Sequence, residues 1–264
     1  MNYFSGSWFP VYTDQLNNPD FAKLSSTAKL YCWLVSSEYN MHGEFYRSDA
    51  WFAAALGCSI ETIRKIRPKL AKLGWIQFIS GKQIPGKQNL ATQYKLVKWA
   101  TVSEEQGGQF AQMHRFAFNA MLSRIRKQTF THDDVMIYVY LNYWEWVHAF
   151  QNEQSKDFFI SKRDLRQLTG VQVELAMRSI RNLYDQFSFN GGNSLFEFTD
   201  EYHKVKVTPL ARFADPSEDE KSRDIAERYY YEIEERAKQI SQEDSEKKQA
   251  QKLKKQAVSI PGKQ

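Results

Sequence analysis

The stretch from Ser59 to Leu73 combines a helical hydrophobic pattern with a strongly basic polar side. Ile60, Ile63 and Leu70 recur at the spacing that puts them on one helix face, so the opposite face must carry the polar side chains. That outward face holds Glu61, Thr62, Arg64, Lys65, Lys69 and Lys72. A row of cationic groups neutralises phosphates, and side chains near the start of a helix can reach base edges in a DNA major groove.

Within this helix we distinguish two kinds of contact by position along its axis. The candidates for base contacts lie in the N-terminal half: Ser59, Glu61, Thr62 and Lys65. The candidates for phosphate contacts are Arg64, Lys69 and Lys72. A polar hairpin follows the helix, and its candidates for following the DNA backbone or entering a minor groove are Lys82, Lys87 and Gln88.

The charge of this region favours an anionic partner. Residues 48–99 contain nine basic and two acidic side chains, a net charge of +7, whereas the whole chain has a formal charge of +5. The net positive charge of this one segment therefore exceeds that of the whole chain. A basic, solvated helix on a protein-interaction module remains the alternative interpretation.

The flanking segments predict how the basic helix is held. One helix should begin after Ser25, a short strand should form at Phe45, and a second helix should follow the N-cap Ser48. Two alternating segments, at 75–79 and 93–97, should be strands that enclose the hairpin. Helix, strand, helix, turn, helix and hairpin is the order of a winged helix.

The same pattern recurs 113 residues later, which indicates an internal repeat. The coinciding pairs are Phe45 with Phe158, Ser48 with Ser161, Phe52 with Leu165, Gly57 with Gly170, Ile63 with Ala176, and Leu70 with Leu183. Each pair preserves a role as a strand, cap, turn or core residue. A turn at Asn190 to Asn193 should form a second hairpin, and Lys204 to Val207 could add a strand.

The second module offers a weaker version of the same surface. Its DNA-binding candidates are Lys162, Arg163, Arg166, Gln172, Arg178, Arg181 and Asn182. Residues 161–213 hold eight basic and six acidic side chains, a net charge of +2, and the hairpin is rich in phenylalanine. We therefore expect the first module to supply most DNA affinity, and the second to supply dimerisation or a weaker half-site contact.

The expected fold class is mainly α with small β-hairpins (α+β), with two tandem winged-helix domains and a charged C-terminal segment. The boundaries are an N-terminal arm and first domain at 1–100, a linker at 101–109, a second domain at 110–214 and a charged helical or disordered tail at 215–264. Phe110 to Lys127 should be helical. The tail has a thin apolar stripe, which predicts a solvated helix that frays, with a coiled coil or partner-docking helix as the alternative.

Residues suited to catalysis are poorly arranged. Gly81 to Lys87 has phosphate-loop spacing, but Gln88 stands where a magnesium-binding Ser or Thr is needed, and the loop joins two strands. The five histidines lack metal-ligand spacing.

Cys32 and Cys58 are expected to be small buried side chains in a reducing compartment. We expect no enzyme activity, cofactor or metal, and without a signal peptide or membrane span we expect a cytoplasmic protein.

Several motifs resemble those of known DNA-binding modules. The segments Ser48 to Ser59, Thr62 to Arg64 and Leu70 to Ile76 resemble the winged-helix modules of bacterial replication and regulatory proteins. Phe9 to Tyr12 and Leu24 to Leu30 are similar to the N-termini of phage and plasmid replication proteins. Two such modules in one chain resemble plasmid or phage replication initiators of the Rep type.

This resemblance implies a protein that binds origin repeats in double-stranded DNA, melts an adjacent region and recruits a helicase or another replication protein. Apart from the resemblance, the expected dimerisation through the second module makes self-association, as in a dimer, a further expectation. Two alternatives stay open. The protein could be a transcriptional regulator that binds an operator, or a winged-helix interaction scaffold that does not bind DNA.

Overall fold

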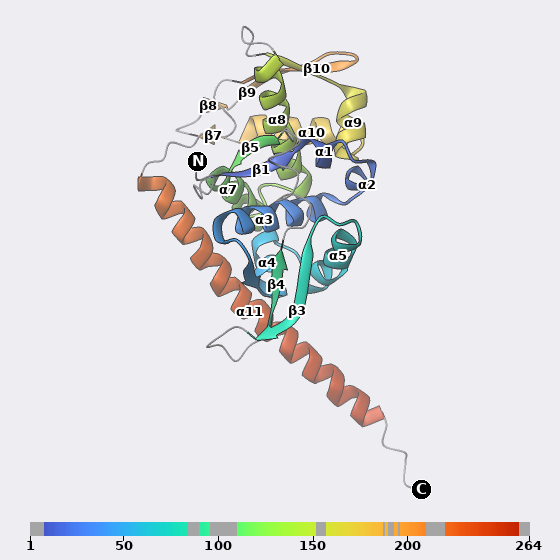
Figure 1. Ribbon diagram of the computed structural model, residues 1–264, viewed down its shortest axis with the longest axis vertical. Coiled ribbons are helices and arrows are strands. Elements are labelled where there is room, and N and C mark those ends of the chain that lie inside the picture. The colour runs from blue at the N-terminus through green and yellow to red at the C-terminus, as the bar shows by residue number, and fades with distance from the viewer. Residues whose placement is uncertain are drawn as a thin grey trace.

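The computed structural model describes residues 8–83, 90–95, 110–151, 157–186, 188–189, 193–194, 196–209 and 220–258. The described chain is mainly helical and contains small antiparallel sheets, as the sequence predicts (Figure 1). The predicted linker at 101–109 lies outside the described residues. A search of the described helices finds none with the length and apolarity that a membrane span requires.

The N-terminal segment is part of the packed body. It comprises β1 (Trp8–Tyr12), α1 (Thr13–Leu16) and α2 (Pro19–Ala22). β1 pairs in antiparallel register with β5 (Phe110–His114), and Phe9 and Val11 are fully buried. The prediction of a helix over 110–114 is therefore wrong. The alternation of buried Ala111 and Met113 with exposed Gln112 fits a strand, whose partner β1 lies about a hundred residues earlier in the chain.

The first repeat follows the predicted order of elements. Its elements are α3 (Ser26–His42), β2 (Phe45–Arg47), α4 (Asp49–Leu56), α5 (Ile60–Lys72), β3 (Gln77–Gln83) and β4 (Leu90–Lys95). The predicted N-caps are confirmed, since the hydroxyls of Ser25, Ser48 and Ser59 each accept a backbone N–H from the first turn of the following helix. β4 lies between β2 and β3 in a three-stranded antiparallel sheet.

The second repeat has the same arrangement. After α7 (Arg115–Arg126), its elements are α8 (His132–Gln151), β6 (Phe158–Ser161), α9 (Lys162–Thr169), α10 (Val173–Gln186), β9 (Phe196–Asp200) and β10 (Lys204–Pro209). Its sheet order, β6-β10-β9, matches β2-β4-β3 of the first repeat. The bounds of α9 are those of α4 displaced by 113 residues, and both helices end at a left-handed glycine, Gly57 or Gly170. The predicted repeat is confirmed.

One detail of the second repeat differs from the prediction. The hairpin expected around Asn190 to Asn193 appears as a separate small ribbon, in which β7 (Ser188–Phe189) pairs with β8 (Asn193–Ser194). The hairpin that joins β6 is formed by β9 and β10. The strand predicted over Lys204 to Val207 is therefore a central strand of the sheet.

The two repeats share a single hydrophobic core instead of lying apart. The rings of Trp33 in α3 and Tyr140 in α8 meet edge to face, 6.0 Å apart. Lys29 in α3 is fully buried, and its ammonium donates to the carbonyl of Ala22, at 2.9 Å, and to that of Thr169 at the end of α9. A Cβ on Gly170 would lie 1.9 Å from the carbonyl oxygen of Ala22, so only glycine permits this contact.

The buried lysine makes the stability of this junction depend on pH. Burial lowers the pKa of Lys29 from 10.5 to about 8, so between these values the unfolded chain binds more protons than the folded chain. The unfolding free energy of the natural protein should therefore rise with pH, relative to that of Lys29→Met, by about 1–3 kcal/mol across this window. Urea unfolding of both proteins from pH 7 to pH 10 measures the difference. A difference that does not change with pH would contradict this prediction.

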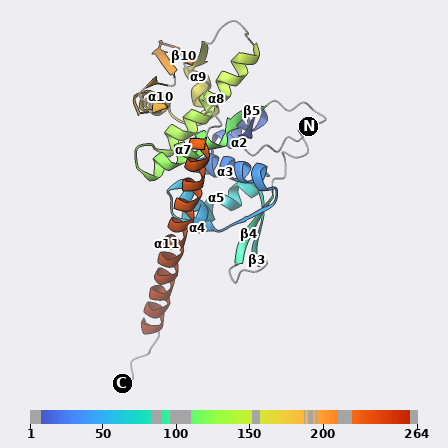
Figure 2. The ribbon, with the colours of Figure 1, turned by 90° about the vertical axis from the view of Figure 1, so that its left-hand side faces the viewer.

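The C-terminal segment departs most from the sequence-based expectation. The predicted helix is present as α11 (Glu220–Val258), but it is not solvated throughout, because it lies along the first repeat before it continues past it (Figures 1 and 2). Tyr229, Ile233 and Ala237, four residues apart on one face, are buried where α11 packs on α4 and α7. The segment thus contributes directly to the core.

Candidate nucleic-acid interface

The predicted two-sided character of α5 is confirmed. Its inner face buries Ile60, Ile63, Ile66 and Leu70 in the core. Its outer face exposes Glu61, Arg64, Lys65, Lys69 and Lys72 to solvent. Because α3 and α4 pack against α5, the basic side chains stand on a rigid element at the surface.

The start of α5 is organised by Ser59 and Thr62. The Ser59 hydroxyl accepts the Thr62 backbone N–H at 3.1 Å, and the two hydroxyl oxygens lie 2.9 Å apart. A hydroxyl has one donor and two acceptor lone pairs, so the cap leaves part of this pair's hydrogen-bonding capacity for a base edge. Ser59 is also exposed, as a base contact would require.

Lys65 and Glu61 form an ion pair one helical turn apart. Their charged atoms are 2.7 Å apart, and the hydrogen bond from Lys65 is the main reason that the pKa of Glu61 falls below its usual value. Both side chains are about 70% exposed, and ion pairs in such settings contribute little free energy. Lys65 can therefore leave this partner at small cost.

Arg64, a predicted phosphate contact, pairs with two carboxylates of the protein itself. Its Nε lies 3.4 Å from a carboxylate oxygen of Asp49 in α4, and its Nη2 lies 3.2 Å from one of Asp244 in α11. These two carboxylates fix the direction of the guanidinium, and each of them also pairs with a second cation, Arg67 or Lys248. The structure thus makes Arg64 a positioning residue that joins α4, α5 and α11.

The neighbouring Arg67 is a structural residue that the sequence analysis did not single out. Its side chain is only 11% exposed, forms an ion pair with Asp49, and donates to Thr92 and Tyr94 in β4. Its guanidinium also lies 4.8 Å from the centre of the Phe78 ring in β3. Arg67 therefore fixes the angle between α5 and the hairpin strands.

Lys69 and Lys72 are the exposed cations best placed for phosphates. Both lie in the last turn of α5, and no carboxylate pairs with either of them among the residues that the structure describes. In the hairpin, Lys82 belongs to β3, but its side chain is outside the described part of the chain. Lys87 and Gln88 also lie outside the described residues, so their predicted role is not tested.

Acidic neighbours occupy part of the corresponding surface of the second repeat. Lys162 and Arg181 both pair with Asp200, at 2.6 and 3.2 Å. Four of the five other candidates are exposed: Arg163, Arg166, Gln172 and Arg178. The free positive charge of this surface is therefore smaller than the sequence candidates suggested.

Asn182 has a structural partner. Its side-chain amide donates to Asp134 at 2.9 Å, and Asp134 forms a reciprocal capping box with Thr131 at the start of α8. The predicted contact of Asn182 with DNA would require this hydrogen bond to be broken. Its observed role is to attach α10 to α8.

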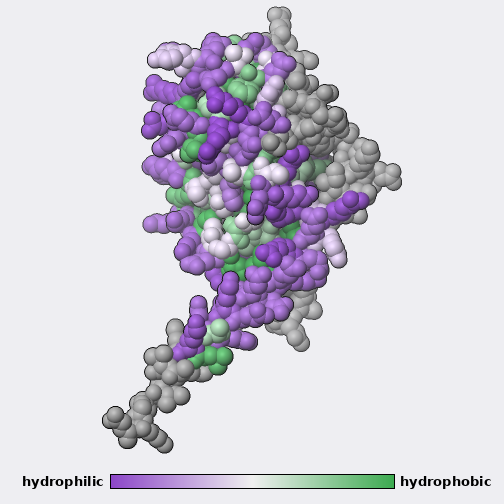
Figure 3. All heavy atoms as spheres, turned by 180° about the vertical axis from the view of Figure 1, so that it is seen from behind, coloured by the Kyte–Doolittle hydropathy of each residue, from purple (hydrophilic) through white to green (hydrophobic). Residues whose placement is uncertain are grey.

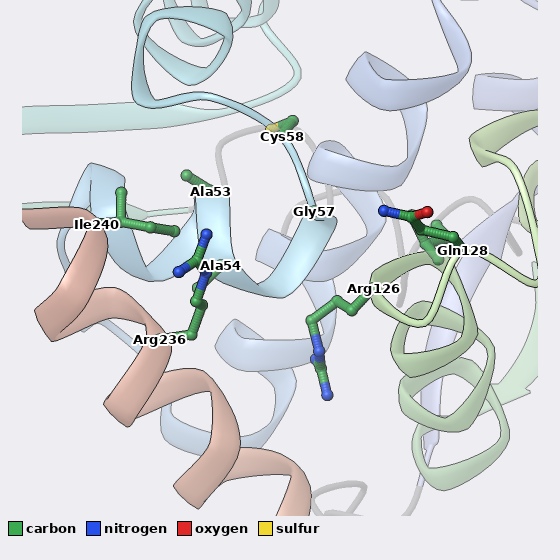
Figure 4. A pocket seen from close by; sticks show the side chains of 9 residues that line it. Ala53, Ala54, Gly57, Cys58, Arg126, Gln128, Arg236 and Ile240 are labelled. Atoms are coloured by element: carbon green, nitrogen blue, oxygen red, sulfur yellow. The ribbon is translucent and has the colours of Figure 1, made fainter. Parts of the chain in front are cut away.

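A hollow of about 460 Å³ lies in the seam between α11, α4 and the end of α7. Figure 4 shows Arg236 and Ile240 of α11 facing Ala53 and Ala54 of α4, with Arg126 on the other side. Arg126 donates to Glu232 at 2.9 Å. Its guanidinium is therefore already used in holding α11.

The described residues contain no group of three or more His, Cys, Asp or Glu side chains that could hold a metal ion. Cys32 and Cys58 are free thiols, and burial raises the pKa of each to about 12, so neither is present as a reactive thiolate at neutral pH. Comparisons with protein-family models, curated proteins and solved structures find no match for this chain.

Proposed function

We propose that this protein binds double-stranded DNA in a sequence-specific manner, with α5 in the major groove and the β3–β4 hairpin on the adjacent backbone. The order α3, β2, α4, α5, β3, β4 is that of a winged helix, and the second repeat has the same order. A helix with its side chains is about 10–12 Å wide, which suits the roughly 12 Å major groove of B-DNA.

The observation that carries this proposal is the outer face of α5. Lys65, Lys69 and Lys72 are all exposed on a helix whose other face is held in the core. Lys65 has only a surface ion pair, and Lys69 and Lys72 have no acidic partner among the described residues. Cations left unpaired on a rigid helix are what a phosphate-binding surface needs, whereas a protein interface has few charges at its centre.

As the biological role we propose a plasmid or phage replication initiator that binds origin repeats and recruits replication proteins. The support is the resemblance of the Phe9 to Tyr12 and Leu24 to Leu30 segments to replication proteins, together with the duplicated architecture. Recovery of the genomic or plasmid fragments that the purified protein retains tests this role. Repeats at a replication origin would support it, whereas promoter operators would favour a transcriptional regulator.

Titration of a labelled duplex at several salt concentrations tests DNA binding itself. Several phosphate contacts should give a log–log slope of affinity against salt of roughly −4 to −7. Affinity that stays constant between low and moderate salt would exclude the phosphate-contact surface. It would favour the interaction-scaffold alternative.

Base-reading and phosphate-binding lysines should respond differently to substitution. Lys65→Ala should relax the preference at one base pair and cost about 1–3 kcal/mol at the specific site, because Lys65 lies in the half of α5 that enters the groove. Lys72→Ala, the matched control at the other end of α5, should weaken specific and random duplexes alike. Equal losses on both duplexes for both variants would refute the base-reading role of Lys65.

A further inference from the structure

The charges of α11 are segregated along its length. Residues 220–246 contain nine acidic and five basic side chains, whereas residues 247–258 contain five lysines and no acid. These five are Lys247, Lys248, Lys252, Lys254 and Lys255, here called the lysine segment. The near-balanced total charge of the helix therefore conceals a strongly basic end.

The lysine segment begins where α11 passes the DNA-binding candidate helix. Asp244, 3.2 Å from Arg64, marks the point at which α11 meets α5. Beyond Glu246, every side chain that the structure describes, up to Lys254, is exposed. Both ribbon views show this end of α11 and the β3–β4 hairpin extending past the body at the same end of the molecule (Figures 1 and 2).

The ordinary reason for lysines at a helix end does not account for this segment. Cations interact favourably with the helix dipole, but the effect falls off within the last turn. The lysine segment begins eleven residues before Val258, about three turns from the end of α11. Seen from behind, the described part of the protruding end is mostly hydrophilic with one small hydrophobic spot (Figure 3). Leu253 is a large exposed hydrophobic side chain in this part of α11, and a single such side chain does not make an apolar docking surface.

We propose that the lysine segment of α11 binds the phosphates of the duplex that flanks the site contacted by α5. This inference depends on the proposed DNA binding and adds a second contact element to it. The helix spans roughly 21 Å from Asp244 to Val258 at 1.5 Å per residue. That length corresponds to about six base pairs at 3.4 Å each.

The test compares two triple variants of the full-length protein with equal changes in charge. The first is Lys247→Gln/Lys252→Gln/Lys254→Gln, in which glutamine preserves helix propensity. The control is the corresponding triple glutamine variant at exposed positions elsewhere: Lys23, Lys127 and Lys238. Duplex affinity is measured at several salt concentrations, together with the length of the protected footprint and the sedimentation mass.

The first variant should reduce the magnitude of the log–log slope of affinity against salt concentration by about 2–3, because each phosphate contact contributes about 0.9 to it. Its footprint should shorten on one side by up to about six base pairs, whereas the control should keep the footprint and nearly the full slope. Equal slopes and footprints for the two variants would overturn the inference alone. A variant that changes only the sedimentation mass would also overturn the inference, because it would indicate that the lysine segment binds a second copy of the chain. A natural protein that binds no duplex would overturn the proposed function as well.

Discussion

Tyr229→Ala is expected to lower the free energy of unfolding by about 3–5 kcal/mol, a large part of the stability of a typical domain. The Tyr229 ring is buried in the seam between α11 and the body, and the Arg126 guanidinium lies 5.0 Å from its centre. The substitution removes an aromatic side chain from the core and leaves a cavity beside α4 and α7. Urea unfolding monitored by circular dichroism measures the loss.

The same helix provides a matched control. Tyr231, two residues further along, is 70% exposed, so Tyr231→Ala should change the unfolding free energy by less than about 0.5 kcal/mol. Both variants lose the same atoms from one helix and differ only in the face affected. Similar small effects at both positions would mean that α11 does not dock on the first repeat in solution.

Charge reversal at the end of α5 should have the largest effect on DNA binding. Lys69→Glu/Lys72→Glu removes the two cations of α5 that have no acidic partner among the described residues. The loss of two phosphate contacts at 0.15 M salt corresponds to about a 30-fold weaker affinity, and repulsion by the new carboxylates adds to it. Fluorescence anisotropy with a labelled duplex measures the change, and an unchanged melting temperature verifies the fold.

Arg163→Glu/Arg178→Glu makes the same change of charge on the second repeat. Because Asp200 already neutralises neighbouring cations there, this variant should lose much less affinity than the α5 variant. The comparison also tests the unequal division of labour between the repeats. If the second-repeat variant loses as much affinity or more, the principal DNA surface lies on the second repeat.

Local patterns in the sequence were sufficient to predict much of the fold. Ser48 and Ser161 cap their helices, and Gly57 and Gly170 end them in the left-handed conformation, because each of these roles depends on a few adjacent residues. The 113-residue repeat, the inner and outer faces of α5 and the capping box of α8 follow from the same kind of signal. All of these are features that a short stretch of chain determines by itself.

Features that depend on distant partners could not be predicted in this way. β5 is a strand because β1 pairs with it, and Asn182 is tied to Asp134 by the packing of α10 on α8. The packing of α11 on the body did have a signal in the sequence of α4. The segment from Ala50 to Leu56 is apolar on all sides. A helix of that kind must be covered on every face. The first repeat cannot cover the outer face of α4 by itself, so another element was required.

The position of α11 has a consequence for biosynthesis. Trp51 of α4 is stacked against Tyr230 of α11, 6.3 Å between ring centres, although the two residues are far apart in the chain. At about 5–20 residues per second, a ribosome adds the intervening segment in roughly 10–40 s. During that interval the part of α4 that α11 covers in the folded protein lacks this cover, and such transiently exposed apolar surface makes a nascent chain prone to aggregation. A helix that is synthesised long after α4 thus completes the core of the first repeat.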